Sequence, residues 1–292
     1  MRDLSIGYRG LAATASGIRE AVRGGTRRLE VAAFIGHSEA VPIFIQAGLW
    51  GLVSGSALLI GALAGWFVPM SRRVIAGIMA FGAGVLISAL SFELMDEAWE
   101  RGGFVPVAAG FFAGAIAFTA LNMLVSSRGA RHRKRSDAEQ RKHDRRPDAD
   151  NGQALAIGAL LDGIPESIVI GVSLLKGGVV GMVAVTAVFL SNIPEGLSSA
   201  AGMKAEGRSL RFVLALWGGI ALASGLAALV GYLAFSGVDR RAVAAVQATA
   251  AGAILAMVVD TMVPEAFEGT HDFAGIIAVA GFLAAFVLSK LG

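Results

Sequence analysis

Long runs of apolar residues follow one another from about residue 44 to the C-terminus, and each is long enough to cross a bilayer as a helix. Because hydrocarbon offers no hydrogen-bond partners, the backbone of such a run must satisfy its polar groups internally, as a helix does. The expected helices cover residues 44–69, 73–98, 104–125, 153–175, 178–203, 210–236, 241–267 and 273–291. The sequence therefore predicts an all-α polytopic membrane protein with about eight transmembrane helices.

Composition agrees with a membrane protein and excludes several kinds of chemistry. Hydrophobic residues make up 55% of the chain and charged residues 16%, against roughly 25% charged in soluble domains. The chain has no Cys, which excludes disulfides, thiolate metal sites and cysteine nucleophiles. The net charge is +3, but the basic residues gather in the tail and loops, where they set orientation and contact anionic lipid. We therefore expect no nucleic-acid partner.

Charge and hydropathy divide the chain into four parts. Residues 1–43 form a polar, Arg-bearing tail without the apolar core of a secretory signal. Residues 44–125 hold the first three expected helices, 126–152 a loop with nine Lys or Arg, and 153–292 the remaining helices. The positive-inside rule places this loop in the cytoplasm, beneath the plasma (inner) membrane. An even number of spans then puts both termini outside, an arrangement that the Arg-bearing tail opposes.

Acidic residues lie within or at the ends of these apolar runs, whose interiors contain no Lys or Arg. They are Glu93, Asp96, Glu97, Asp162, Glu166, Glu195, Asp260 and Glu265. A carboxylate at the bilayer centre costs at least about 2.5–3.5 kcal/mol. Such groups must be protonated, solvated in a cavity or neutralised by a bound cation, and the last two conditions indicate a cation pathway.

Two consecutive expected helices carry the same short motif. The first reads Leu-Asp-Gly-Ile-Pro-Glu and ends at Glu166, and the second reads Leu-Ser-Asn-Ile-Pro-Glu and ends at Glu195. Each Pro lacks an N–H, so it frees the carbonyl oxygen of the Leu that opens the motif, one turn from the carboxylate. Broken helices that present carbonyls and carboxylates hold cations in transporters. We predict a divalent-cation site built from oxygens of Asp162, Glu166, Ser191, Asn192 and Glu195.

A second internal similarity relates the expected second and seventh helices. The segment from Gly84 to Glu97 matches the segment from Gly252 to Glu265 in the spacing of Gly and Glu. Together with the paired motifs, this match predicts an inverted-repeat architecture with the site at the repeat interface. The residues Glu93, Glu97, Asp260 and Glu265 lie toward helix ends. They line the ion path or serve as interfacial caps, and the sequence leaves both options open.

The paired motifs resemble the fourth- and fifth-helix signatures of the ZRT/IRT-like protein (ZIP) family of metal transporters, in which His-Asn-x-Pro-Glu-Gly is typical. The similarity extends over roughly residues 44–292, with the charged loop after the third helix and Pro-Glu-Ala at 264–266. It implies eight helices and alternating access, with helices one, four, five and six moving against two, three, seven and eight.

The resemblance also implies a ligand set, from which this chain departs. Asp162 stands where the family has its ligand His, Gly163 stands where it has Asn, and Ala228 occupies the position of a glutamate on helix six. The first metal site would use Asp162, Glu166, Ser191 and Glu195, and the second would use Asn192 with the two glutamates. We therefore expect one competent site. Its all-oxygen ligands should bind Zn²⁺ less selectively and favour Mn²⁺ or Fe²⁺.

We expect a transporter of divalent metal ions such as zinc, manganese or iron rather than an enzyme, with the metal as substrate and no cofactor. The alternative is a proton-coupled carrier of another solute that uses the same acids as relays. An intramembrane metalloprotease would need a motif such as His-Glu-x-x-His, which is absent. The four histidines, His37, His132, His143 and His271, lie outside the apolar runs. Metal ions and lipid are the expected partners, and a homodimer is an option that the sequence leaves open.

Overall fold

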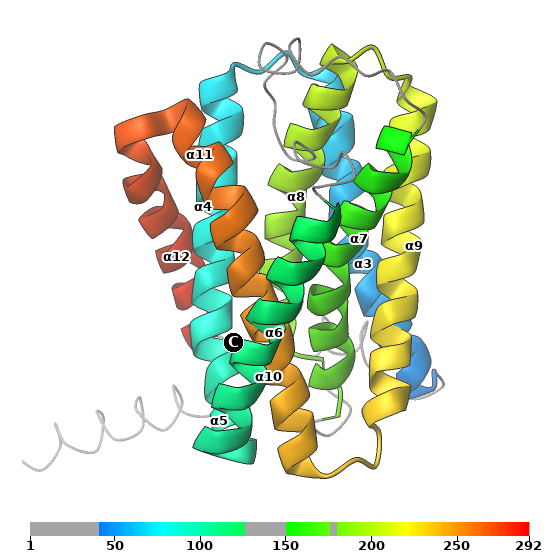
Figure 1. Ribbon diagram of the computed structural model, residues 1–292, viewed down its shortest axis with the longest axis vertical. Helices are drawn as coiled ribbons and strands as arrows, with labels where there is room; N and C mark the ends of the chain where they lie inside the picture. Colours follow the sequence, from blue (N-terminus) through cyan, green and yellow to red (C-terminus); the bar gives the residue numbers. More distant parts are fainter. Residues whose placement is uncertain (1–40, 126–149, 176–179, 292) are drawn as a thin grey trace, which may run out of the picture. The chain divides into compact units, whose positions relative to one another are not determined.

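The computed structural model describes residues 41–125, 150–175 and 180–291, and all regular secondary structure in these ranges is helical (Figure 1). The chain divides into two compact units, Met1–Pro42 and Ile43–Gly292. Nearly all of the first unit lies outside the described residues, as do most of the basic loop and three of the histidines, His37, His132 and His143. The second unit holds every helix discussed below.

Helices cover all of the expected segments, with boundaries that differ by a few residues. They are α3 (Ile43–Phe67), α4 (Arg72–Ala89), η2 (Leu90–Met95), α5 (Asp96–Gly102), α6 (Phe104–Val125), α7 (Asp150–Ser173), α8 (Met182–Ala205), α9 (Leu210–Phe235), α10 (Arg240–Met257), η5 (Val258–Met262), α11 (Val263–Thr270), η6 (His271–Phe273) and α12 (Ala274–Leu291). The π-helical segments η2 and η5 continue the helices before them, so α4–η2–α5 and α10–η5–α11 each form one long helix. The chain then reverses at His271, which has φ 46°.

Five helical stretches among the described residues are long and apolar enough to cross a membrane: Ile43–Phe67, Arg72–Gly102, Phe104–Val125, Leu210–Phe235 and Arg240–Leu291. The last of these contains the reversal at His271. Helices α7 and α8 are not among these five stretches. The described part of the chain therefore has the character of an all-α membrane protein.

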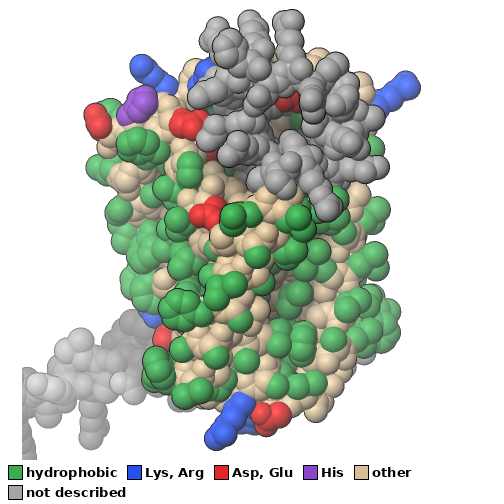
Figure 2. All heavy atoms as spheres, viewed as in Figure 1, with side chains coloured by type: hydrophobic (Ala, Val, Ile, Leu, Met, Phe, Trp, Pro, Cys, Tyr) green, Lys and Arg blue, Asp and Glu red, His purple; other side chains and the backbone are tan. Residues whose placement is uncertain are grey.

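The surface of the helices is apolar where a lipid-facing surface is expected. On α6, Phe112 and Ile116 are 69% and 67% exposed, and Ile276 of α12 is 68% exposed. On the face shown in Figure 2, hydrophobic side chains cover the middle, and Lys and Arg side chains lie toward the two ends. Apolar exposure of this extent is characteristic of a membrane or interaction surface.

The helices form two packed groups. Helix α3 packs against α8 and α9, and α7 packs against α9, which makes a four-helix bundle of α3, α7, α8 and α9. In the second group α4 packs against α12 and α10 packs against α6. Contacts of α4 with α8 and of α10 with α7 join the two groups. The motif-bearing helices therefore lie in the first bundle and also contact the second.

Close backbone contacts join α3 to α8 and require glycine. A Cβ atom added at Gly61 or Gly65 of α3 would clash with the backbone of Ile193 or Leu197 on α8. The reverse holds at Gly196 of α8, which lies against the α3 backbone. Small residues at such interfaces allow helices to approach closely in lipid. This packing fixes the register of α8 against α3 beside the second motif.

Basic residues of several helices share one end of the bundle. The α3–α4 turn, the start of α7 and the α8–α9 turn lie at this end (Figure 1). It carries Arg72, Arg73, Lys204, Arg208 and Arg211. We call it the loop end, because the basic loop connects α6 to α7. Arg101, Arg240, Arg241 and Lys290 belong to the opposite, far end.

Candidate functional site

The five residues predicted to bind a cation are all buried. Asp162 is 1% exposed and Glu166 2% on α7, while Ser191, Asn192 and Glu195 on α8 are 1%, 5% and 4% exposed. Two helices outside the motifs add buried hydroxyl groups in the same bundle. We define the polar layer as Ser54 of α3, Asp162, Glu166 and Ser167 of α7, Ser191, Asn192 and Glu195 of α8, and Ser224 of α9.

Apolar side chains lie on both sides of this polar layer. The cluster nearer the loop end, the loop-side cluster, consists of Leu58, Ala62, Ala159, Ala200, Met203, Val213, Trp217 and Ile220. The cluster nearer the far end, the far-side cluster, consists of Ile170, Val185, Val188 and Ala228, with Trp50 packed against it. Along α9, for example, Ile220 precedes Ser224 and Ala228 follows it. The polar layer is thus closed off by hydrophobic packing toward both ends of the bundle.

Hydrogen bonds fix several side chains of the polar layer. The Asn192 amide nitrogen donates to the backbone oxygen of Ser54 at 3.0 Å and so links α8 to α3. The hydroxyl of Ser191 donates to the Val188 carbonyl at 2.9 Å, and that of Ser167 donates to the Gly163 carbonyl at 2.7 Å. With its nitrogen engaged by α3, the Asn192 side chain has its oxygen as the remaining acceptor.

The two motif prolines lie inside their helices, and the α-helical structure continues through both of them. Pro165 and Pro194 have no N–H to give to the carbonyls of Leu161 and Leu190. Pro194 packs where Gly82 of α4 leaves room, since a Cβ at Gly82 would lie 2.6 Å from the proline ring. The second motif therefore contacts both groups of helices.

Carboxylates alone do not form a metal cluster in this conformation. Within the described part of the chain, no three Asp, Glu, His or Cys side chains lie close enough together to hold one metal ion. A cation bound in the polar layer would therefore take hydroxyl, amide or backbone oxygens as well. Opposite Gly163 the structure places Ser224 of α9, whose hydroxyl would lie 3.6 Å from an added Cβ. Ala228, at the position that the family resemblance gives to a glutamate, belongs to the far-side cluster.

Two of the four predicted pathway acids lie on the helix that runs from α4 to α5, away from the polar layer. Glu93 accepts a hydrogen bond of 2.6 Å from Ser289 of α12. Glu97 pairs with Arg101 at 2.7 Å and accepts a hydrogen bond of 2.8 Å from Gln247 of α10. These contacts fasten α5 and η2 to their neighbours, so Glu97 has the polar partners that the helix-cap interpretation requires.

The other two predicted pathway acids differ in their burial. Glu265 of α11 is 5% exposed and accepts a hydrogen bond from the hydroxyl of Ser198 on α8. Ser198 follows Glu195 by three residues, so this contact lies about one helical turn from the polar layer. Asp260 in η5 is exposed. Glu265 is thus the pathway acid with a direct hydrogen bond to a motif-bearing helix.

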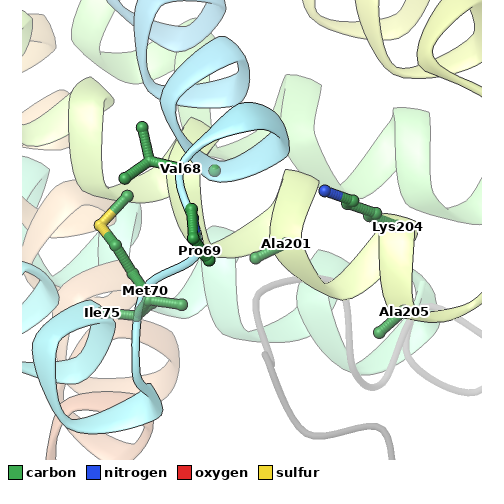
Figure 3. A pocket seen from close by; sticks show the side chains of 8 residues that line it. Val68, Pro69, Met70, Ile75, Ala201, Lys204 and Ala205 are labelled. Atoms are coloured by element: carbon green, nitrogen blue, oxygen red, sulfur yellow. The ribbon is translucent and has the colours of Figure 1, made fainter.

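A surface cavity of about 390 Å³ lies at the loop end, between α3, the α3–α4 turn, α4 and α8 (Figure 3). Its lining is apolar except for Lys204, which donates a hydrogen bond to the Trp66 carbonyl at the end of α3. A fixed positive charge disfavours a metal cation here. The cavity is therefore separate from the candidate cation site.

Sequence reasoning did not identify Ser54, Ser167 and Ser224 as members of the polar layer. A single Ser in an apolar run is common at helix contacts in membranes, and it does not indicate which helix it faces. The sequence gives only a partial indication for Ser54, which precedes Gly55 and follows Gly51 by three residues, on a face that packs closely against α9.

His271, the one histidine among the described residues, lies at the end of α11, with its ring centroid 6.0 Å from that of Phe267.

No protein-family model matches the chain. No curated protein matches it either.

Proposed function

We propose that this protein transports divalent metal cations such as zinc, manganese or iron, and that the polar layer of α7 and α8 is its substrate site. The observation that carries the proposal is the burial of Asp162, Glu166 and Glu195 between two apolar clusters of a membrane bundle. We assign the chain as a divergent member of the ZIP family on its paired Ile-Pro-Glu motifs.

The energetics of the polar layer favour a cation as the transported species. An ionised carboxylate in the bilayer interior costs at least about 2.5–3.5 kcal/mol unless something neutralises it. The four described helices that form the layer have no Lys or Arg in their membrane-spanning interiors. A divalent cation balances two of the three carboxylates, and the neutral oxygens of Ser191 and Asn192 add to its ligand shell. Such oxygen ligands suit Mn²⁺ better than Zn²⁺.

The two groups of helices support an inverted repeat. The π-helical segments begin at Leu90 and Val258, and each lies six residues after the Gly of its matched segment, Gly84 or Gly252. Gly84 contacts the backbone of α12, whereas Gly252 contacts the backbone of α6. Equivalent residues thus make equivalent contacts in the two repeats. This relation supports eight spans and alternating access, with α3, α7, α8 and α9 moving against the other helices.

We place the protein in the plasma (inner) membrane with its basic loop in the cytoplasm. The five cations at the loop end of the bundle support this orientation under the positive-inside rule. Eight spans then leave both termini outside. Helices α7 and α8 can cross the membrane despite their polar residues, because α3, α9, α4 and α10 pack against them.

A proton-coupled carrier of another solute is the second candidate. The hydrogen bond from Ser198 to Glu265 favours it, since it places a second buried carboxyl about one turn from Glu195. Chains of carboxyl and hydroxyl groups serve as proton relays in transporters. The two candidates differ in whether a metal ion is required.

The deciding experiment is uptake of Mn²⁺, Fe²⁺, Zn²⁺ and Cd²⁺ into proteoliposomes, with Glu195→Ala as the inactive control. We expect saturable uptake that the control lacks, with Mn²⁺ or Fe²⁺ preferred. Absence of flux for every metal, from protein that is folded and correctly inserted, would exclude metal transport and favour the proton-coupled carrier.

A further inference from the structure

Ser54 of α3 differs from the other buried serines beside it. It is 1% exposed, and its hydroxyl oxygen has no hydrogen-bond partner among the described residues. The hydroxyls of Ser167 and Ser191 each donate to a carbonyl of their own helix. A buried hydroxyl left without a partner carries a desolvation cost, and in native proteins such a group calls for a specific explanation.

The surroundings of Ser54 place it within the polar layer. Its own backbone oxygen accepts the hydrogen bond from the Asn192 amide, so α3 contacts the second motif at this residue. Trp50, one turn before it, packs on the far-side cluster, and Leu58, one turn after it, belongs to the loop-side cluster. The free hydroxyl therefore lies at the same level of the bundle as the predicted ligands.

Ser224 brings a second hydroxyl to this level from α9. It is 7% exposed, and it packs between α3 and α7: an added Cβ at Gly55 would lie 3.1 Å from its Cβ. On the other side, its hydroxyl would lie 3.6 Å from an added Cβ at Gly163. The two glycines leave room around Ser224 from both neighbouring helices.

We propose that Ser54, together with Ser224, supplies neutral oxygen ligands to the cation bound in the polar layer. This inference rests on the proposed function and names ligands that the paired motifs do not contain. The described carboxylates alone do not form a metal cluster. The two hydroxyl groups would provide additional ligands to the same cation. They also give a reason why the site should prefer Mn²⁺, because hydroxyl and carboxylate oxygens bind Mn²⁺ better than they bind softer metal ions.

The test replaces the hydroxyl and measures metal binding by the purified full-length protein. Free Mn²⁺ is followed by electron paramagnetic resonance, and we expect Ser54→Ala to weaken Mn²⁺ binding about tenfold, the effect of losing one ligand. Ser88→Ala is the matched control, because Ser88 of α4 is also 1% exposed with no hydroxyl partner among the described residues. We expect that control to bind Mn²⁺ like the wild type.

A gain-of-function variant separates ligation from packing. In Ser54→Cys the thiol is unique, since the natural chain has no Cys. A thiolate ligand favours soft metals, so we expect this variant to gain Cd²⁺ affinity and the ultraviolet absorption of a cadmium–thiolate bond. Ser88→Cys should show neither change.

The outcomes distinguish this inference from the proposed function. If Glu195→Ala loses Mn²⁺ binding while Ser54→Ala retains it and Ser54→Cys gives no cadmium–thiolate signal, Ser54 is no ligand and the transporter proposal stands. If the Ser54 and Ser88 variants changed metal affinity equally, the change would come from altered packing, and Ser54 would not be a ligand. A wild-type protein that binds no metal would refute both proposals.

Discussion

Neighbouring serines on α8 show how one residue position decides the role of a buried hydroxyl. Ser198 is fully buried and donates a hydrogen bond to the Glu265 carboxylate of α11. Ser199 is 3% exposed, and its hydroxyl has no partner in the described part of the chain. Because successive helical residues point about 100° apart, only one of the two can face α11.

We expect Ser198→Ala to lower the free energy of unfolding by about 1–3 kcal/mol, because the buried carboxylate of Glu265 loses a donor. Ser199→Ala should leave stability almost unchanged, since it removes a hydroxyl that makes no hydrogen bond. Thermal unfolding of both variants in the same detergent measures the difference. Equal destabilisation would mean that the contact with Glu265 contributes nothing.

The carboxylates of the polar layer give a second prediction at the residue scale. Glu166→Gln and Glu195→Gln preserve shape but remove the negative charge that the proposed cation site requires, so each should abolish metal binding and leave the protein folded. Isothermal titration with Mn²⁺ measures binding, and gel filtration with circular dichroism measures folding. Glu100→Gln, on the exposed surface of α5, is the charge-matched control. Metal binding retained in both motif variants would remove these glutamates from the site.

At the scale of helices, sequence reasoning identified the positions of the elements but not their irregularities. The apolar runs predicted every long helix of the described residues, because lipid leaves the backbone no alternative. The start of α7 at Asp150 came three residues earlier than expected, and α8 began at Met182, four residues later. Such shifts are normal, since helix ends depend on local hydrogen bonds that hydropathy does not report.

The π-helical segments lay beyond sequence reasoning. Segment η2 contains Glu93 and is followed by Glu97, and the side chain of Gln247 donates to the Leu94 carbonyl at 3.3 Å. This contact comes from a residue of α10 more than a hundred positions away. Tertiary contacts of that kind have no local signature. The same limit explains why the sequence singled out the motif residues but not Ser54 and Ser224, which lie buried in the same polar layer on other helices.

The close approach of α3 to α8 gives a prediction at this scale. Gly61→Ala should lower the free energy of unfolding by roughly 1–3 kcal/mol, because its Cβ would clash with the Ile193 backbone and push the helices apart. Gly218→Ala in α9 is the control, since the described structure leaves open space within 4 Å of its Cβ. That change should stabilise the protein by about 0.4–1 kcal/mol. Chemical unfolding in detergent compares them, and a Gly61→Ala protein as stable as wild type would contradict the packing.

At the scale of the whole molecule, the alternation of helix directions sorts the connecting segments into two sets. The α3–α4 and α8–α9 turns share the loop end, whereas the α5–α6 and α9–α10 turns share the far end (Figure 1). More of the described Lys and Arg residues lie at the loop end. The positive-inside rule relates such a bias to orientation, because positively charged loops tend to remain in the cytoplasm.

The absence of native Cys makes the topology directly testable. Single Cys substitutions at the exposed residues Val68 and Glu206 mark the loop end, and those at Glu100 and Val238 mark the far end. In intact cells, a membrane-impermeant maleimide should label only Glu100→Cys and Val238→Cys. In inside-out vesicles the pattern should reverse. Labelling of a loop-end and a far-end position from the same side would refute the helix arrangement across the membrane.

The hydrophobic clusters on either side of the polar layer have an electrical consequence. Tightly packed Leu, Ile, Val and Trp side chains leave no room for a column of water, so neither hydrated ions nor protons can flow through the bundle in a stream. Under the proposed transport function, each crossing requires one cluster to open while the other stays closed. A membrane filled with this protein would therefore show no unitary current steps, and its throughput would follow the rate of helix movement rather than of diffusion.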